Sequence, residues 1–182
     1  MRITGGEARG LRLVVPRSLH VRPTSDRVRG ALFQLVGQTV ANANVLDLYA
    51  GTGALGIEAL SRGAASVDFV ENNGRLCQII KQNIKSAGFV GRGNVHKTSV
   101  KQSLTTLKGL YDLVLLDPPY EMTDLTEIMV RSGDSNLLSN KGMVILEHSK
   151  RTVVEERYGT LRLEKQKRYG DTSVSVYIKG EA

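Results

Sequence analysis

A strand-like apolar run at residues 44–49 leads straight into a glycine-rich turn, and a helical pattern follows at residues 55–60. Glycine allows a tight turn between a strand and a helix because it has no Cβ to clash. The rest of the chain repeats this alternation. Strand-like runs fall at residues 66–71, 94–96, 111–117 and 142–147, with helical patterns between them at residues 74–87, 100–107 and 124–131. Strands that alternate with helices predict an α/β fold with a parallel sheet covered on both faces.

Both ends of the chain depart from this alternation. Residues 2–4 and 11–15 suit the two arms of a small N-terminal β-hairpin, and a helix with an N-cap in residues 22–26 follows. At the other end, two strand-like runs flank a Gly-Asp turn, which predicts an antiparallel hairpin. We expect a mostly parallel seven-stranded sheet with an antiparallel C-terminal hairpin strand and helices on both faces. The 182 residues fit one domain, residues 1–182, with residues 1–22 as a hairpin extension.

The composition is that of an ordinary globular protein, with 41% hydrophobic and 24% charged residues. A single cysteine can form neither an internal disulfide nor a thiolate metal cluster. No apolar run approaches the ~20 residues of a membrane span, and the first residues lack the apolar core of a signal peptide. These features favour a cytoplasmic protein without membrane contact.

The net charge of +7 is unevenly distributed. Residues 1–30 hold seven arginines and two acidic residues, a net +5, whereas residues 31–149 hold 10 basic and 11 acidic residues, a net −1. Residues 150–182 hold 8 basic and 5 acidic residues, a net +3. Basic segments are typical of polyanion binding, although a solubilising surface has the same composition. Arginine without lysine in the first 30 residues favours phosphate contact, because the guanidinium group binds phosphate with two parallel hydrogen bonds.

The glycine turn holds Gly51, Gly53 and Gly56 in the spacing of a dinucleotide-binding loop. Two carboxylates narrow the ligand. Asp47, in the preceding strand, would repel a pyrophosphate but suits a cationic amino group, and Glu71, at the end of the next strand, suits the two hydroxyls of a ribose. S-adenosylmethionine carries both groups, and the arrangement resembles the cofactor site of class I methyltransferases. On this motif alone, a NAD-binding oxidoreductase stays open.

A second motif, Asp117-Pro118-Pro119-Tyr120, directly follows the apolar run at residues 113–116. Two prolines remove two backbone donors and fix φ, so the loop is stiff. Asp117 and the Pro118 carbonyl can accept hydrogen bonds from an exocyclic NH₂ group, and Tyr120 can stack on a flat base. We therefore predict that Asp117, Pro118 and Tyr120 are catalytic residues. The tetrapeptide resembles the motif of amino-group methyltransferases that act on adenine, guanine N2, cytosine or protein glutamine.

Longer segments resemble the RsmD family, whose members are guanine-N2 methyltransferases of 16S ribosomal RNA. The resemblance runs in order through nearly the whole chain, in segments 1–6, 22–33, 46–64, 117–120 and 169–172. It implies a Rossmann-like class I methyltransferase fold and S-adenosyl-L-methionine as the cofactor. It also implies methyl transfer to the exocyclic N2 amine of a guanine in small-subunit ribosomal RNA.

The family pattern further implies which side chains meet the cofactor. Some lie around the glycine turn and others in a segment that closes over the cofactor. The implied cofactor contacts are Thr24, Asp26, Arg29, Asp47, Gly51, Gly53, Glu71, Ser99 and Asp117. The chain departs from the pattern at Ser99, where Asp or Asn is common, and at Asn72, which replaces an acidic residue often seen after the ribose-binding Glu.

The expected partner is 16S rRNA in an assembled or assembling small subunit, with Arg9, Arg12 and Arg22 as candidate RNA contacts. We expect a monomer that needs no metal, because the cofactor brings its own electrophilic methyl group. The alternatives are an amino methyltransferase acting on DNA adenine-N6 or protein glutamine-N5, and a non-catalytic RNA-binding assembly factor. The basic ends argue against the protein substrate, and the lack of a separate target-recognition domain argues against sequence-specific DNA methylation.

Overall fold

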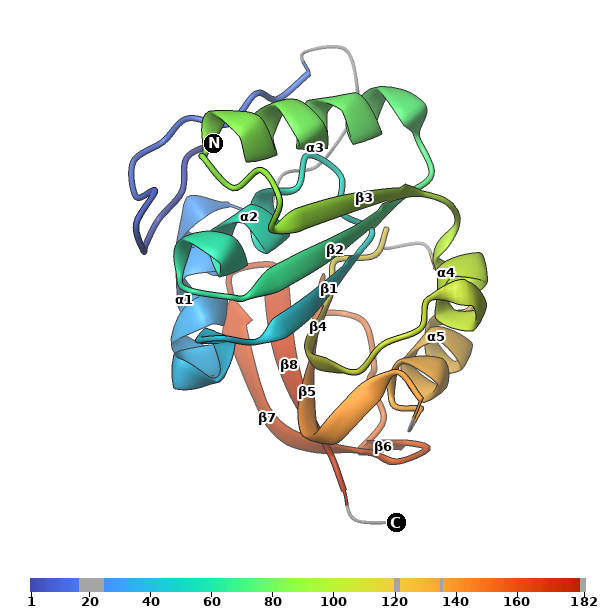
Figure 1. Ribbon diagram of the computed structural model, residues 1–182. Coiled ribbons are helices and arrows are strands. Elements are labelled where there is room, and N and C mark those ends of the chain that lie inside the picture. Colours follow the sequence, from blue (N-terminus) through green and yellow to red (C-terminus); the bar gives the residue numbers. More distant parts are fainter. Residues whose placement is uncertain (17–24, 120–121, 135, 181–182) are drawn as a thin grey trace.

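The computed structural model describes residues 1–16, 25–119, 122–134 and 136–180 (Figure 1). Its framework is a sheet of eight strands in the order β3-β2-β1-β4-β5-β8-β7-β6. Neighbours from β3 to β5 run parallel, and β8, β7 and β6 continue the sheet in antiparallel pairs. The strands are β1 (Asn44–Leu48), β2 (Ser66–Glu71), β3 (Gly93–Lys97), β4 (Tyr111–Leu116), β5 (Leu138–Ser149), β6 (Arg157–Tyr158), β7 (Leu161–Tyr169) and β8 (Thr172–Lys179).

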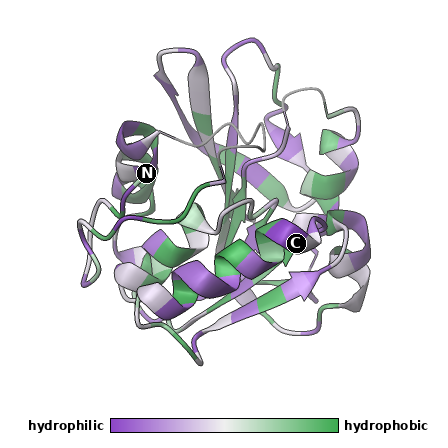
Figure 2. Ribbon diagram, turned by 90° about the horizontal axis from the view of Figure 1, so that it is seen from above, coloured by the Kyte–Doolittle hydropathy of each residue, from purple (hydrophilic) through white to green (hydrophobic). Residues whose placement is uncertain are grey.

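Helices cover both faces of the sheet, as the alternation predicts (Figure 1). The first three α-helices pack on one face and the last two on the other. Figure 2 shows hydrophilic and hydrophobic residues interleaved along these helices, as expected where one side meets a sheet and the other meets water. The helices are α1 (Asp26–Val36), the short 3-10 helix η1 (Gly37–Val40), α2 (Ala54–Ser61), α3 (Gly74–Ser86), α4 (Val100–Thr106) and α5 (Leu125–Ser132).

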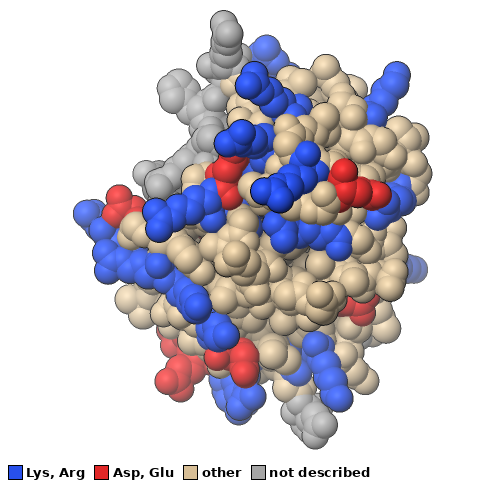
Figure 3. Space-filling model, turned by 90° about the vertical axis from the view of Figure 1, so that its left-hand side faces the viewer, with Lys and Arg blue, Asp and Glu red and all other residues tan. Residues whose placement is uncertain are grey.

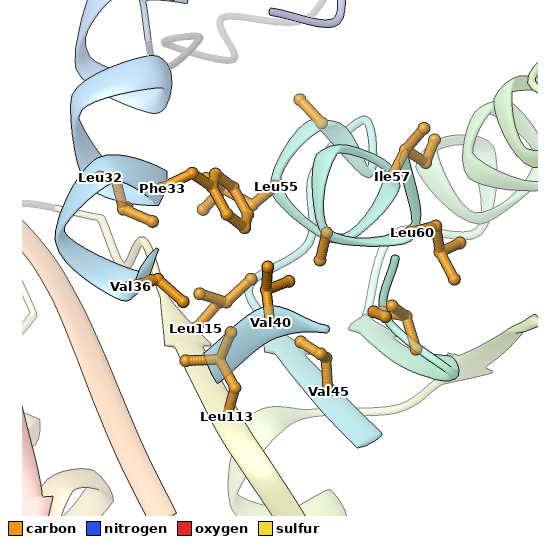
Figure 4. Close-up of a cluster of buried hydrophobic side chains, with 14 of the residues drawn as sticks. Leu32, Phe33, Val36, Val40, Val45, Leu55, Ile57, Leu60, Leu113 and Leu115 are labelled. Atoms are coloured by element: carbon orange, nitrogen blue, oxygen red, sulfur yellow. The ribbon is translucent and has the colours of Figure 1, made fainter. Parts of the chain in front are cut away.

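The largest cluster of buried side chains lies between the sheet and helices α1, α2 and α3 (Figure 4). In it, Leu32 and Phe33 of α1 face Leu55 of α2 and the side chains of the central strands. The residues of β4 from 113 to 116 are at most 1% exposed, because helices cover them on both faces. This two-sided burial explains why the sequence of β4 is apolar throughout instead of alternating.

The sheet has one strand more than the sequence analysis predicted. The additional strand is β6, whose Arg157 and Tyr158 pair with the beginning of β7 at the edge of the sheet. Two residues are too few to produce an alternating pattern, so this strand has no sequence signal of its own. The predicted C-terminal hairpin is confirmed, with its turn at Gly170, whose φ is 65°. The predicted N-cap is confirmed at Ser25, whose side chain accepts a hydrogen bond from Val28 N over 3.1 Å.

The N-terminal segment folds back on itself as expected, but it holds a single β-bridge, between Arg2 and Arg12, instead of two strands. It lies lengthwise along α2. Its ends meet the glycine turn, where Met1 Sδ is 3.8 Å from Thr52 Oγ1. Its tip meets the far end of α2, where Glu7 N donates to the carbonyl of Ser61 over 2.8 Å.

Residues 17–22 of the predicted extension lie outside the described residues, as do the predicted site residues Arg22, Thr24 and Tyr120. Within the described ranges, none of the helices has both the length and the apolar character needed to cross a membrane.

Candidate active site

Three of the predicted carboxylates meet at the end of the sheet that is formed by the carboxyl ends of its parallel strands. Strand β1 lies between β2 and β4, so the chain order reverses direction there, and ligands of open α/β sheets bind outside the carboxyl ends of the strands at this point. Leu48 of β1 is level with Val70 of β2 and Leu116 of β4. Glu71 and Asp117 come one residue later on their strands, so they flank the end of β1 on either side.

These carboxylates also share one face of the sheet. Side chains alternate between the two faces with a period of two residues. Asp47, Glu71 and Asp117 each stand two residues after a side chain that packs in the cluster under α1, α2 and α3. Their side chains therefore project on the face that carries the glycine turn and α2, in agreement with the effect of Glu71 and Asp117 on the pKa of Asp47.

The three glycines of the turn have different structural roles. Gly51 and Gly53 have φ values of 57° and 81°, in the left-handed region that residues with a Cβ rarely adopt. Gly53 also forms the N-terminal cap position of α2. Gly56 lies inside α2, and a Cβ there would stand 2.2 Å from Cε1 of Phe69 on β2. Gly56 therefore lets the helix pack closely on the sheet, whereas Gly51 and Gly53 shape the turn itself.

Asp47 is the most deeply buried of the three carboxylates, at 1% exposure. Its Oδ2 accepts a hydrogen bond from Gly56 N over 2.9 Å, while its Oδ1 has no hydrogen-bond partner. Burial raises the pKa of Asp47 to about 8, and the charges of Asp117 and Glu71 act in the same direction. A buried carboxylate oxygen without a donor fits a cationic amino group, as the sequence analysis predicted for Asp47.

Glu71 holds the glycine turn from the neighbouring strand. Its Oε2 accepts from Gly51 N over 3.0 Å, and its Oε1 accepts from Asn73 N over 2.8 Å. Each carboxylate oxygen has a second lone pair, so both can still accept from a ligand hydroxyl. Asn73 in turn caps α3 through its own side chain, which accepts from Arg75 N and Leu76 N. The position suits the predicted contact with a ribose, which stays a prediction.

The Asp117-Pro118-Pro119 segment leaves the end of β4 with Pro118 buried and Pro119 exposed. The carbonyl of Pro119 accepts from Met122 N over 3.1 Å, which closes a turn. Tyr49, which the sequence analysis placed in the first strand, has a φ of 63°, and its hydroxyl is 3.0 Å from Sδ of Met122. Tyr49 thus links the glycine turn to this segment, a contact that no local sequence pattern indicates.

Asp26 and Arg29, predicted at the cofactor, take part in an ionic cluster in which Arg29 and Glu58 are fully buried and Asp26 is partly exposed. The Arg29 side chain is fully buried, its Nη2 is 2.8 Å from Oδ1 of Asp26, and its Nε is 3.2 Å from Oε2 of Glu58. Glu58 also accepts from Thr4 N, Thr4 Oγ1 and Arg62 Nε over 2.7–2.8 Å. This cluster fastens the N-terminal segment and α1 to α2. No local sequence pattern indicates the role of Glu58, because Thr4 and Arg29 are far from it in the chain.

The other predicted site residues lie around this centre. Ser99 caps α4, with its hydroxyl accepting from Gln102 N over 3.2 Å. Arg9 and Arg12 are exposed on the N-terminal segment. Arg12 lines a pocket of about 350 Å³ together with Met1, Arg2 and Asp26. Across the described ranges, no cluster of three or more His, Cys, Asp or Glu side chains could hold a metal ion.

Comparison with known proteins finds similarity to a family of methyltransferases. The family model described as Conserved hypothetical protein 95 matches residues 1–178. The Escherichia coli protein named ribosomal RNA small subunit methyltransferase D is 37% identical over 149 residues, which cover 81% of this chain and 74% of that protein. The Bacillus subtilis protein YlbH is 30% identical over 98% of this chain and 99% of its own length. The solved structure of Escherichia coli yhhF is 31% identical, with a TM-score of 0.87 over 100% of this chain and 99% of that chain.

The sheet order and the three carboxylates around the glycine turn define a Rossmann-like methyltransferase. The chain belongs to the family described as Conserved hypothetical protein 95, the RsmD family of methyltransferases.

Proposed function

We propose that this protein transfers a methyl group from S-adenosyl-L-methionine to the exocyclic N2 amine of a guanine in 16S ribosomal RNA. The observation that carries the proposal is the position of Asp117-Pro118-Pro119, directly after β4 and beside Asp47 and Glu71. The name of the Escherichia coli relative supports ribosomal RNA of the small subunit as the substrate. The choice of guanine N2 rests on the resemblance to the RsmD family.

Asp47 and Glu71 hold the two ends of the cofactor in this proposal. The Oδ1 atom of Asp47 accepts from the amino group of the methionine part, and the free lone pairs of Glu71 accept from the ribose hydroxyls. Gly51 and Gly53 leave their own two positions of the turn free of side chains. Thr24, Asp26, Arg29 and Ser99 remain proposed contacts. When bound, S-adenosyl-L-methionine supplies a methyl group on a sulfonium, which is already electrophilic.

Asp117 and the Pro118 carbonyl orient the target amine. The lone pair of a guanine amine is delocalised into the ring, so the amine is a poor nucleophile until it is held in position. Positive charge develops on its nitrogen during the transfer, and fixed acceptors stabilise that charge. The base must leave its stack to reach this edge, and stacking on Tyr120 offsets part of that cost.

The setting of the reaction follows from the same chemistry. We propose a single domain that acts as a monomer in the cytoplasm on 16S rRNA in an assembled or assembling subunit. Arg9, Arg12 and Arg22 bind the RNA backbone. No metal takes part, because neither the methyl donor nor the amine needs a Lewis acid. Gel filtration with light scattering tests the monomer, and binding at rising salt to an Arg9→Ala, Arg12→Ala variant tests the arginines.

One assay tests the proposed activity. The protein and S-adenosyl-L-methionine with a labelled methyl group are incubated with unmethylated small subunits, free 16S rRNA, DNA and total protein. We expect label in the rRNA, at the N2 atom of one guanine after nuclease digestion. Label in DNA adenine or protein glutamine would establish the other amino methyltransferases. Binding of NADH instead of S-adenosyl-L-methionine in calorimetry would establish the oxidoreductase, and RNA binding without transfer would establish the assembly factor.

A further inference from the structure

A second basic surface lies at the same end of the strands as Asp117. We define the C-terminal rim as Lys150, Arg151, Lys167 and Arg168, all of which are exposed. Strand β5 runs parallel to β4, so Lys150 and Arg151 follow its carboxyl end. Strand β8 is antiparallel to both β5 and β7, so β7 runs in the same direction as β5. The last residues of β7 lie beside the beginning of β8, where Thr172 is level with Ser149 of β5. The four cations therefore gather around one end of the sheet.

Three of the four cations of the rim act on a single acidic side chain. Lys150 forms an ion pair with Asp171 in the turn between β7 and β8. The positive charges of Lys150, Arg151 and Arg168 all lower the pKa of Asp171, with Lys150 contributing most. Four cations and one carboxylate leave a local net charge of +3. Three cations close enough to perturb one carboxylate form a site for several anionic groups, and phosphates of a nucleic acid backbone are such groups.

The backbone beneath the rim is ordered by hydrogen bonds. Lys150 N donates to the carbonyl of Asp171 over 2.9 Å, and Arg151 N donates to Ser149 Oγ over 3.2 Å. The Arg168 side chain donates from Nε to the carbonyl of Gly170 over 3.1 Å. The rim is thus a preformed surface made by the end of β5 and the hairpin of β7 and β8, and binding a backbone there costs little ordering of the protein.

The rim stands within reach of the reacting amine. Leu116 of β4 is level with Leu146 of β5, so Asp117 is level with Glu147 and Lys150 lies three residues beyond it. Three residues of strand span about 10 Å, and neighbouring strands lie about 4.8 Å apart. Arg168, level with Ser173 and His148 of the intervening strands, is three strands away from β4, or about 14 Å. An RNA strand with one base at Asp117 would therefore place neighbouring phosphates over the rim.

The tip of the N-terminal segment occupies a different position. It meets Ser61 at the end of α2, and Glu7 pairs with Arg92, which directly precedes β3. Ser61 and Arg92 are both at the end of the sheet opposite to Asp117. Helix α2 has eight residues, so the tip with Arg9 is about 12 Å farther from the site than the glycine turn. Figure 3 shows basic side chains in separate bands on the side of the molecule that carries α1 and the N-terminal segment.

From these positions we propose that Lys150, Arg151, Lys167 and Arg168 bind the phosphates that flank the target nucleotide of the RNA substrate. The proposal rests on the proposed function, and it assigns the RNA contact nearest to the reacting base to the C-terminal hairpin. The Arg9 end of the N-terminal segment can then contact only RNA that extends past the far edge of the sheet.

The test replaces all four cations of the rim with glutamine, which keeps most of each side chain and removes its charge. The matched control replaces four exposed cations at the opposite edge of the sheet: Lys85, Lys108, Arg157 and Arg162. Both variants lose four positive charges, so a difference between them reports position and not net charge. The affinity for S-adenosyl-L-methionine and the thermal midpoint of each variant show that it is folded.

The measured quantities are the Kd for unmethylated small-subunit rRNA at several salt concentrations, and kcat/KM for labelled methyl transfer to it. Each phosphate contact contributes about 0.7 to the slope of log Kd against log salt for single-stranded RNA. We expect the rim variant to lose about 3 units of slope and at least tenfold in kcat/KM. The control should lose less than a third of the slope, and less than a third of the factor in kcat/KM, that the rim variant loses. Equal losses in the two variants, or no loss in the rim variant, would overturn the proposed role of the rim in binding RNA. If the wild-type protein binds this RNA through the rim but transfers no methyl group to it, the proposed function fails and the rim stands.

Discussion

Asp47 and Gly56 are joined by a hydrogen bond of 2.9 Å from the Gly56 backbone N–H to Oδ2 of Asp47. This bond ties the end of strand β1 to the first turn of α2 and fixes the carboxylate so that Oδ1 remains unpartnered. Burial disfavours the ionised form of Asp47 as long as no cation is bound beside it. The environment of Asp47 therefore suits a cationic ligand group.

Binding of S-adenosyl-L-methionine should release a proton near neutral pH. The pKa of Asp47 is raised to about 8 in the ligand-free protein, so at pH 7 most molecules carry a protonated carboxyl. The cationic amino group binds the ionised form and lowers that pKa. We expect the affinity to fall as pH drops below about 8, by up to about tenfold per unit. Calorimetry in buffers of different ionisation enthalpy measures the proton directly, and Asp47→Asn should bind more weakly and release no proton from this site.

The same group makes the ligand-free protein less stable as pH rises. The folded pKa of about 8 exceeds the unfolded value near 3.8, so between these pH values the folded state binds more protons than the unfolded state. Folding stability therefore falls with rising pH in that window, by up to about 1.4 kcal/mol per unit from this group alone. Urea unfolding at pH 5 and pH 7.5 measures the trend. The wild-type protein should lose more stability over this interval than Asp47→Asn, and parallel curves for the two would contradict the assignment.

Replacement of Asp117 by alanine should slow the reaction far more than it weakens binding of the cofactor. In the proposed reaction the carboxylate of Asp117 accepts a hydrogen bond from the amine whose charge develops during the transfer, and removal of one such fixed group costs about 10²–10³ in kcat. Single-turnover methyl transfer measures the rate, and calorimetry measures the Kd for S-adenosyl-L-methionine. Asp117→Asn keeps an acceptor oxygen and should retain more activity than Asp117→Ala. Transfer at nearly the wild-type rate by Asp117→Ala would refute the role of Asp117.

Gly56 and Gly30 provide a matched pair of helical glycines. A Cβ at Gly56 would stand 2.2 Å from the Phe69 ring, whereas a Cβ at Gly30 would stand 3.5 Å from Thr4 Oγ1, an ordinary contact. We expect Gly56→Ala to lower the free energy of unfolding by about 1–3 kcal/mol through overpacking. Gly30→Ala in α1 should raise it by up to about 1 kcal/mol through helix propensity. Urea unfolding of both variants checks the pair, and equal effects would mean that the contact with Phe69 does not decide the outcome.

The sequence predicts the centre of this site well, because the centre depends on local order. Asp47, Glu71 and Asp117 stand at the ends of strands whose apolar patterns are clear, and parallel strands bring their carboxyl ends to one edge. The glycine spacing likewise fixes the turn. Predicting these features requires only the position of each strand, its two-residue period and its neighbouring strand.

The remaining features depend on contacts between distant segments. Glu58 lies on an ordinary helical pattern, and only the fold shows that residues 4, 29 and 62 converge on it. The positive φ of Tyr49 arises where the strand meets the turn, and no residue type there signals it. The N-terminal arginines suggest RNA contact by charge alone. Only the packing of their segment along α2 shows that Arg9 lies at the end of α2 that is farther from Asp117.

The buried cluster around Glu58 should be more sensitive to substitution than any exposed ion pair. Glu58 is fully buried and receives hydrogen bonds from Arg29, Arg62 and Thr4. Removal of one partner from a buried ionic cluster leaves an uncompensated charge and typically costs about 3–5 kcal/mol. We therefore expect Glu58→Ala to lose stability on this scale, measured by urea unfolding.

The matched control for this prediction is Glu127→Ala, since Glu127 forms its ion pairs on the surface of α5 with Lys101 and Arg131. An exposed pair contributes about 0–1 kcal/mol, so this variant should remain close to the wild-type protein. Raising the salt concentration should weaken the contribution of Glu127 and leave that of Glu58 nearly unchanged, because screening acts on exposed charges. If both variants lost the same stability, Glu58 would not fasten the N-terminal segment to α2.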